Sequence, residues 1–535
     1  MMPLKVINEK VRCNVYIYFA LVCFLLTAGV LFRFTNLGKR IYWHDETGTS
    51  LRVAGYTDGE VIAELTNAPI ISAKILLKYQ RPSHEKSVID TIKSIISDDP
   101  HHPPLYFLMS RFWAQWIGYS PEAMRMLAAI ISLFVLPCLY WLSIELFGSR
   151  RTAFLAFAMI CVSPMHVLFA REAREYSLWS LTTTLSSAAL LSALRVQSKS
   201  AWVIYAITLV IGFYSHLFFT FVAAAHGIYT ILFITSQNRG HYFSRKLFLP
   251  YMLASLTALL AYSPWIGVVI VHYHTILDYN QWSGFPLDFI QLVRGWAASY
   301  SRVFVDFEPF QDLVKIVFGF PILFLIGTSL FFIWRKGQEN AWKFIFLLIG
   351  TTAGSLILPD LILGGYRSII ARYIMPCFIG ILLAVACFLS TQIAASRYWR
   401  QKVWQLIVLT LFLLSIMSNF LLVRSESWWD KGGGGDHGRP KMMQTINEAD
   451  RPLLIVDGHI ATHLGHFLSF GHELDPHVNV KWGFNVNDET YDHYSDIFIY
   501  HPSNTLWQAL VRGSKYQLEE IVPQLLYHLA KIEKS

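Results

Sequence analysis

Residues 403–423, VWQLIVLTLFLLSIMSNFLLV, form an apolar stretch without a charged residue. A transmembrane helix needs about 20 consecutive, mostly apolar residues to cross the hydrocarbon core of a bilayer. This stretch meets that requirement, and Arg400 and Lys402 immediately before it are typical of a loop at the membrane surface. The stretch therefore predicts a membrane span.

The composition of the whole 535-residue chain agrees with this interpretation. Hydrophobic residues make up 54% of the chain and charged residues only 15%. An ordinary globular chain has about 25% charged residues, and a soluble protein as apolar as this one could not cover its own surface. The composition excludes a set of soluble domains and predicts a polytopic α-helical membrane protein.

Apolar stretches along the chain predict about eleven spans, with twelve or thirteen as alternatives. If the N-terminus is cytoplasmic, the short basic loops between these spans all lie on the cytoplasmic side, as the positive-inside rule requires. The C-terminus is then extracytoplasmic, and the net charge of +8 reflects topology and does not indicate a nucleic-acid partner. The predicted spans are 14–32, 122–145, 152–169, 176–194, 201–215, 217–235, 247–270, 314–333, 343–358, 372–393 and 403–423.

A further apolar stretch, 104–118, is short and carries Arg111 in its middle. If it crossed the membrane, most of the basic loops would lie outside. We therefore expect a helix that lies in the outer interface, with Trp113 and Trp116 at the level of the headgroups.

The polar segments predict the domain organisation. Residues 1–423 are expected to form the membrane module, with a first outer loop at 34–121 and a second at 272–312. A glycine-rich linker at 424–436 leads to the tail at 437–535.

The tail is predicted to be a small extracytoplasmic α/β domain. Apolar runs at 453–458 and 496–502 are typical of buried strands, and the stretches 461–474 and 504–512 are typical of helices.

The first outer loop begins with Trp43-His44-Asp45-Glu46, shortly after the first predicted span. A carboxylate near the lipid surface can accept a proton from a hydroxyl group as a general base. Asp45 and Glu46 are therefore candidate catalytic residues. The alternative is the first turn of a helix, where acidic residues are common.

The same loop ends with Asp98-Asp99-Pro100-His101-His102, followed by two more prolines. The prolines would fix the backbone, so that His101 and His102 could bind phosphate or take part in proton transfer. Together with Asp98 and Asp99 they could bind a metal ion, although adjacent histidines rarely point at one ion. The alternative is a helix-start signal with proline in the first turn.

Further charged residues stand at predicted outer ends of spans, where charge is costly unless it is paired or used. In the run 171–175, Arg171 and Arg174 could hold a phosphate through bidentate hydrogen bonds, or form a self-neutralising turn with the neighbouring glutamates. Arg372, next to Tyr373, could neutralise a substrate phosphate or extend to lipid phosphates.

Two tail histidines, His463 and His466, would share a helix face. No third ligand completes a zinc pattern beside them, so we expect them to be solvated and predict no metal site there.

The ordered set of motifs resembles one family. The chain is similar to the GT-C membrane glycosyltransferases of the family 39-like group, which includes the protein O-mannosyltransferases and the lipid A aminoarabinose transferase. The resemblance covers residues 14–235 well and the later spans loosely. The motifs are Trp43-His44-Asp45-Glu46, His102-Pro103-Pro104-Leu105-Tyr106-Phe107, Arg125, Phe147-Gly148-Ser149-Arg150-Arg151, Ser163-Pro164, Arg171 to Leu178, and Arg372-Tyr373.

This resemblance implies an enzyme that moves a sugar from a polyprenyl-phosphate carrier to an acceptor hydroxyl on the outer face, with inversion. The acceptor would be a protein, a lipid or a glycan. Asp45 would be the general base, and Glu46 would orient the acceptor or tune Asp45. The residues implied to bind the donor are His101, His102, Arg171, Glu172, Arg174, Arg372 and Tyr373.

The resemblance leaves three points open. Mannosyltransferases carry an aspartate at the position of Tyr176, so a second carboxylate is either supplied by Glu172 or absent. No cofactor is firmly implied, and a divalent metal has no compact ligand set in the sequence. The alternative function is a transporter or flippase of lipid-linked saccharides, which predicts charged residues in the middle of several spans.

Overall fold

The computed structural model describes residues 20–237, 245–308, 312–429, 438–458, 462–484, 491, 493–512 and 516–531. The chain divides into two compact units. We call Met1–Thr35, Pro100–Tyr106 and Arg125–Val423 the membrane unit. We call Asn36–Asp99, Phe107–Met124 and Arg424–Ser535 the sheet unit.

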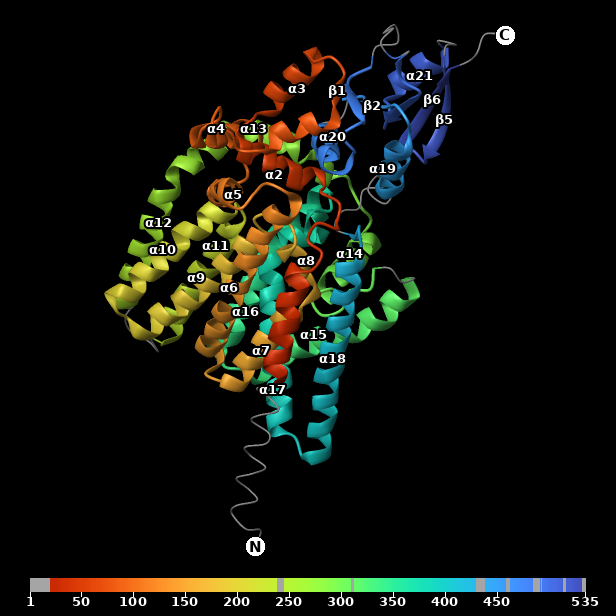
Figure 1. Ribbon diagram of the computed structural model, residues 1–535. Helices are drawn as coiled ribbons and strands as arrows, with labels where there is room; N and C mark the ends of the chain where they lie inside the picture. Colours follow the sequence, from red (N-terminus) through yellow and green to blue (C-terminus); the bar gives the residue numbers. More distant parts are fainter. Residues whose placement is uncertain are drawn as a thin grey trace. The chain divides into compact units, whose positions relative to one another are not determined.

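The long helices of the membrane unit pack alongside one another (Figure 1). Each of the predicted spans corresponds to a helix or, for 152–169, to the consecutive pair α7 and α8. The helices are Ala20–Phe34, α6 (Pro121–Phe147), α7 (Arg150–Val162), α8 (Pro164–Ala170), α9 (Tyr176–Val196), α10 (Lys199–Ser215), α11 (Phe219–Gln237), α12 (Arg245–Val271), α13 (Tyr273–Tyr279), α14 (Phe289–Ser301), α15 (Asp312–Lys336), α16 (Glu339–Leu363), α17 (Met375–Ala395) and α18 (Tyr398–Arg424). Short 3-10 turns include η2 (Gln281–Gly284), η3 (Arg367–Ile369) and η4 (Ala371–Tyr373).

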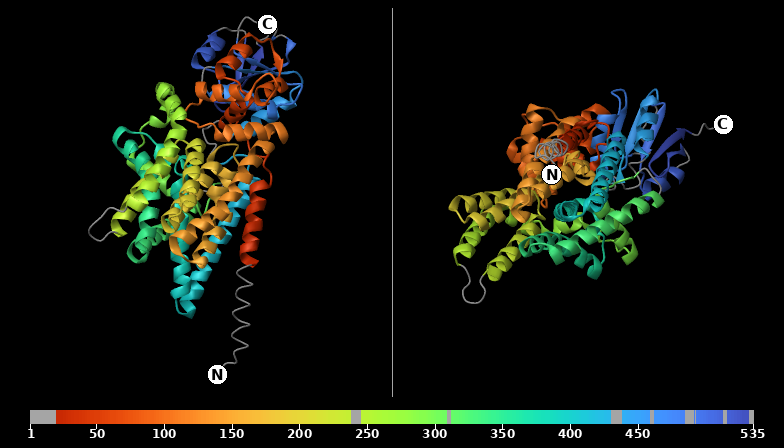
Figure 2. Two further views of the ribbon diagram at one scale, coloured as in Figure 1. Left: turned by 90° about the vertical axis from the view of Figure 1, so that its left-hand side faces the viewer. Right: turned by 90° about the horizontal axis from the view of Figure 1, so that it is seen from below.

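The first outer loop and the tail contribute different elements to the sheet unit. In Figures 1 and 2 the red and orange elements of the loop lie beside the blue strands of the tail. The loop supplies α2 (His44–Ala54), α3 (Asp58–Asn67), β1 (Ile71–Ser72), η1 (Ala73–Gln80), α4 (Val88–Asp98) and most of α5 (Leu105–Trp116). The tail supplies α19 (Arg439–Glu448), β2 (Pro452–Val456), α20 (Thr462–Glu473), β3 (Asn479–Trp482), β4 (Asp496–Tyr500), α21 (Asn504–Arg512), β5 (Tyr516–Val522) and β6 (Leu526–Lys531).

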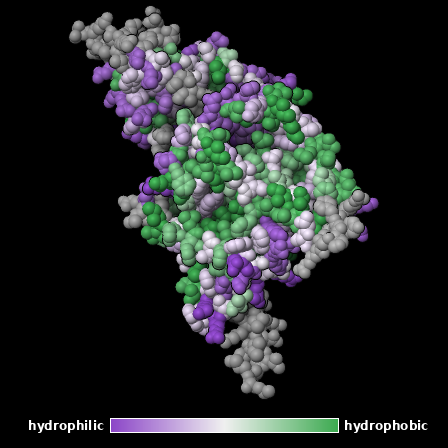
Figure 3. Space-filling view, turned by 180° about the vertical axis from the view of Figure 1, so that it is seen from behind, coloured by the Kyte–Doolittle hydropathy of each residue, from purple (hydrophilic) through white to green (hydrophobic). Residues whose placement is uncertain are grey.

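The membrane class predicted from the sequence is confirmed. Among the described residues, seven helices are long and apolar enough to cross a membrane, or eight if α7 and α8 form one span bent by 54°. The bend falls at Pro164, which has no N–H group to continue the helical hydrogen bonds. Apolar side chains such as Leu260 and Phe320, each 70% exposed, gather on the surface of the helices (Figure 3). The predicted total of about eleven spans stays a prediction.

Helix α5 matches the predicted interfacial helix at 104–118. With 12 residues it is about 18 Å long, which is too short to cross a bilayer core of about 30 Å. Trp116 is exposed, as expected of a headgroup anchor. Arg111, the charge in its middle, is buried and donates hydrogen bonds to the Val53 and Lys86 carbonyls and to the Thr91 hydroxyl.

The tail forms the predicted α/β fold around a six-stranded sheet of order β1-β3-β2-β4-β6-β5. Strand β2 runs parallel to β3 and β4, and its side chains are buried on both faces, which explains its continuous apolar sequence. The observed β2, α20, β4 and α21 correspond to the four elements predicted from the sequence. Most of the predicted linker, residues 430–436, lies outside the described residues.

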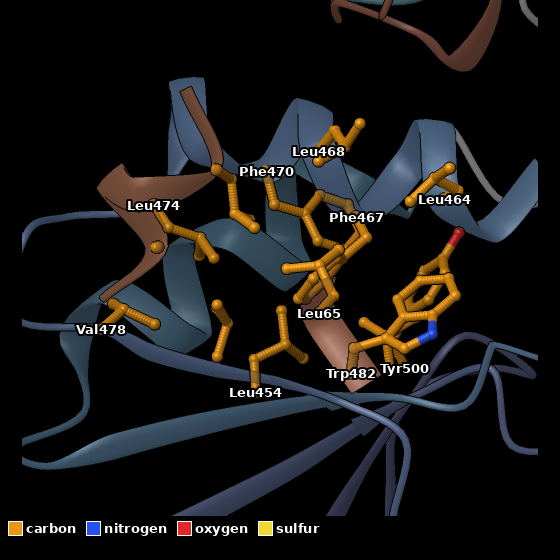
Figure 4. Packing of buried hydrophobic residues seen from close by; sticks show 14 of the residues in the cluster. Leu65, Leu454, Leu464, Phe467, Leu468, Phe470, Leu474, Val478, Trp482 and Tyr500 are labelled. Atoms are coloured by element: carbon orange, nitrogen blue, oxygen red, sulfur yellow. The ribbon is translucent and has the colours of Figure 1, made fainter. Parts of the chain in front are cut away.

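The first outer loop shares the hydrophobic core of the tail. Strand β1 pairs antiparallel with β3, as an edge strand of the sheet. Leu65 of α3 lies between Leu454 of β2 and Phe467 of α20 in the core cluster (Figure 4). The loop was predicted to belong to the membrane module at 1–423, whereas most of it forms one compact unit with the tail. The pairing of β1 with β3 joins segments about 400 residues apart, and local sequence patterns do not predict such a contact.

Candidate active site

The candidate base Asp45 lies in the first turn of α2. Trp43 is extended and precedes the helix, and Asp45 and Glu46 occupy the end where helix dipoles favour negative charge. The helix-start alternative is thus realised, but it does not remove Asp45 from solvent, since its side chain is 24% exposed. Glu46 is fully buried, which favours a role in tuning Asp45 over direct contact with an acceptor.

Helix α20 of the tail packs closely against the start of α2. At Gly465, a Cβ atom would lie 2.8 Å from the Cβ of His44, so only glycine permits this approach. His466 of the same helix places its Nε2 atom 3.2 Å from Nδ1 of His44. The expectation that His463 and His466 are solvated was wrong: His463 is buried and His466 is half-buried, because α20 packs on both the sheet and α2.

In the membrane unit, His102 joins Arg174 and Glu175. The Nδ1 atom of His102 lies 2.9 Å from Oε1 of Glu175, and its Nε2 atom lies 3.0 Å from Nη2 of Arg174. Arg174 also lies 3.6 Å from the second carboxylate oxygen of Glu175. Burial raises the pKa of the Glu175 carboxyl, but Arg174 and His102 outweigh it and hold this pKa well below its usual range. Glu175 is therefore a buried carboxylate that lies beside both Arg174 and His102.

The run 171–175 is a turn between α8 and α9, not a helix. Arg171 and Arg174 therefore do not share a helical face. The Nη1 atom of Arg171 donates hydrogen bonds to the carbonyls of Phe32 and Thr35, each at 2.6 Å. These carbonyls end the helix Ala20–Phe34, so Arg171 caps its C-terminus. Glu172 is buried in the same turn.

Aromatic rings surround this network. Trp179 stacks on His216 with ring centroids 3.9 Å apart and an interplanar angle of 2°. Burial lowers the pKa of His216 to about 3, so its imidazole is neutral at physiological pH. His101 lies against His102, with ring centroids 4.1 Å apart.

The later motif extends the aromatic surface. Tyr373 contacts Phe218 edge-to-face at 5.3 Å, next to the turn that holds His216. The half-buried Arg372 guanidinium lies 5.7 Å from the ring centroids of both Trp282 and Tyr373. A cation held between two rings keeps its N–H donors oriented, as a phosphate ligand requires.

Asp98 and Asp99, considered above as metal ligands, pair with a cation of the sheet unit. The buried Arg52 lies 3.0 Å from Asp98, 2.7 Å from Asp99 and 2.6 Å from Asp58. This cluster ties α2 to the end of α4.

Sequence reasoning missed four residues of these two groups. Glu175 stands in the run 171–175, but Glu172 was preferred as the second carboxylate, although a glutamate directly before an apolar span was a signal. The participation of His216, His466 and Tyr500 depends on contacts between distant segments, which a single sequence does not display.

The fold of the chain is of the GT-C type, by its similarity to solved structures. Two solved structures with this fold are ArnT from Cupriavidus metallidurans bound to undecaprenyl phosphate (TM-score 0.52, 13% identity, 96% of this chain and 98% of that chain), and the oligosaccharyltransferase AglB from Archaeoglobus fulgidus in complex with an inhibitory peptide and a dolichol-phosphate (TM-score 0.51, 10% identity, 97% and 75%).

The sequence comparisons point to the same group. Residues 101–267 match the family described as dolichyl-phosphate-mannose-protein mannosyltransferase. The undecaprenyl phosphate-alpha-4-amino-4-deoxy-L-arabinose arabinosyl transferase of Pectobacterium carotovorum is 25% identical over 293 residues, which are 53% of this chain and 48% of that protein. The match thus spans about half the length of this relative. These similarities confirm the resemblance to GT-C glycosyltransferases that the ordered motifs indicated.

Proposed function

We propose that the chain is an inverting membrane glycosyltransferase that moves a sugar from a polyprenyl-phosphate carrier to an acceptor hydroxyl. The observation that carries the proposal is the partly exposed Asp45 carboxylate at the start of α2, just after the first apolar helix of a GT-C fold. The names of the relatives, which include an undecaprenyl phosphate-dependent transferase, support the donor class.

In the proposed reaction, Asp45 accepts the proton of the acceptor hydroxyl. At the same time the oxygen of that hydroxyl attacks the anomeric carbon of the donor sugar. The bond from that carbon to the phosphate oxygen breaks, and polyprenyl phosphate leaves with the bonding electrons. Arg372 neutralises the charge that grows on the leaving phosphate, which is where electrostatic stabilisation acts most strongly. His102 and Arg174 bind the donor, and Glu175 holds them in place.

The proposed orientation has a cytoplasmic N-terminus and an extracytoplasmic sheet unit. The gathering of the short basic loops on one side supports it. Arg195 pairs with Glu145 at 2.8 Å where α6 and α9 end, on the side predicted to be inside. His102 and Glu175 meet at the opposite end of α9, on the side predicted to be outside.

Reconstitution of the purified protein in liposomes tests the function. Polyprenyl-phosphate mannose and polyprenyl-phosphate aminoarabinose would be offered with peptide, lipid and glycan acceptors. We expect one donor to lose its sugar to one acceptor, with release of polyprenyl phosphate. If the labelled donor instead crosses the bilayer with its sugar intact, the chain is a flippase and the proposal is wrong.

Arg372→Ala is expected to lower kcat/KM for the donor about 10-fold to 100-fold, because a charge-assisted hydrogen bond to the phosphate contributes about 1.5–3 kcal/mol. Initial rates at varied donor concentration measure this. Arg335→Ala is the matched control, since Arg335 lies over the Trp334 ring at the same 5.7 Å but at the opposite end of the spans. Equal effects of the two substitutions would contradict the role of Arg372.

A further inference from the structure

Three residues of the sheet unit form a chain that ends at Asp45. The Tyr500 hydroxyl lies 2.8 Å from Nδ1 of His466. Nε2 of His466 lies 3.2 Å from Nδ1 of His44, and Nε2 of His44 lies 3.4 Å from Oδ1 of Asp45. Tyr500 ends strand β4, and in Figure 4 its hydroxyl points toward helix α20.

We propose that Tyr500, His466 and His44 are positioning residues that hold the Asp45 carboxylate ionised and oriented for proton abstraction. This inference rests on the proposed function, in which Asp45 is the base. It assigns to the tail of the chain a direct part in the chemistry of the first outer loop.

The direction of the hydrogen bonds follows from chemistry. An ionised Asp45 only accepts, so Nε2 of His44 carries the hydrogen that faces it. A neutral His44 then accepts at Nδ1, which makes Nε2 of His466 the donor between the two rings. Nδ1 of His466 is left to accept from the Tyr500 hydroxyl, so every donor in the chain points toward Asp45.

The surroundings keep His466 neutral, as this order requires. Burial lowers the pKa of His466 well below its usual value, and the positive charge of the nearby Arg439 lowers it further. His463 and His501 are the other titratable groups that face it. A neutral imidazole has one N–H group. If Nε2 of His466 donates to His44, Nδ1 of His466 can only accept, and its donor is the Tyr500 hydroxyl.

The packing holds the rings in register. The His44 and His466 rings stack with centroids 5.0 Å apart and an interplanar angle of 16°. Gly465 brings the two helices close enough for this stacking, since any side chain there would collide with His44. Tyr500 is buried, so its hydroxyl has little competition from water.

Tyr500→Phe and His466→Leu test the inference through the pH profile of kcat/KM. Each variant loses a donor, so Asp45 is protonated more easily and the acid limb moves to higher pH. We expect about a 10-fold loss of kcat at neutral pH for His466→Leu, less for Tyr500→Phe, and an unchanged KM for the donor. His466→Gln retains an N–H donor at the place of Nε2 and is expected to recover part of the rate. His477→Gln, an exposed histidine bonded to the Ala449 carbonyl, is the control.

Two outcomes separate this inference from the proposed function. If the wild type transfers sugar and all variants keep its pH profile, the positioning chain is overturned and the function stands. If the wild type transfers no sugar, the function fails, and deuterium exchange at the imidazole C2 atoms of the intact protein decides the chain. The pH midpoint of exchange at the His44 imidazole is compared between the wild type and His466→Leu. A shifted midpoint supports the contact between the two rings, and an unchanged midpoint overturns it.

Discussion

Asp45→Asn is expected to abolish sugar transfer, lowering kcat by at least about 100-fold, because general base catalysis typically contributes about 10²–10⁴-fold. The carboxamide has nearly the same shape but accepts no proton from the hydroxyl. Since the side chain is partly exposed, we expect the variant to insert and to bind the donor lipid. Single-turnover transfer with labelled donor measures the rate, and donor binding is measured separately.

Asp450→Asn is the matched control for this substitution, because Asp450 is an exposed carboxylate of the same unit. It is expected to leave transfer unchanged. Asp45→Glu keeps a base but moves it by one methylene, so an intermediate rate is expected. Full activity of Asp45→Asn would remove Asp45 from the role of base, whatever the control shows.

The membrane helices were predictable because lipid imposes a length and an apolar composition on each span. The run at 403–423 lies within α18 for this reason. The break at Ser163-Pro164 was also visible as a proline, but its 54° bend was not, since bending depends on the packing around it. The strands β2 and β4 were visible as short apolar runs.

The composite sheet unit was not predictable in the same way. Strand β1 has only two residues and gains its stability from β3, so its own sequence carries little signal. The contact of His44 with His466 spans 422 positions and depends on a glycine in α20. The position of Asp45 followed from its motif, whereas its hydrogen-bonded surroundings required the tertiary fold.

Arg174→Met is expected to destabilise the protein by about 3–5 kcal/mol, because it leaves the buried Glu175 without the permanent positive charge of Arg174. Glu175→Gln removes the charge itself and is expected to cost less. The double variant is expected to recover much of the loss of Arg174→Met, since no unpaired carboxylate then remains in the turn. Unfolding of each variant in mixed micelles by added sodium dodecyl sulfate measures the free energies.

Lys78→Met provides the comparison, because Lys78 pairs with Glu64 at 2.6 Å and the two side chains are 45% and 49% exposed. A solvent-exposed pair contributes about 0–1 kcal/mol, so this substitution is expected to change the free energy of unfolding little.

The dependence of stability on pH gives a second test of Glu175. Its pKa is depressed in the folded protein, so the stability that its ionised form contributes is present above the ordinary pKa of about 4.3. This contribution is lost as the pH falls toward the depressed value. The wild type should therefore lose more stability below about pH 4 than Glu175→Gln does. Equal acid sensitivity of the two proteins would mean that Glu175 is not held ionised by Arg174 and His102.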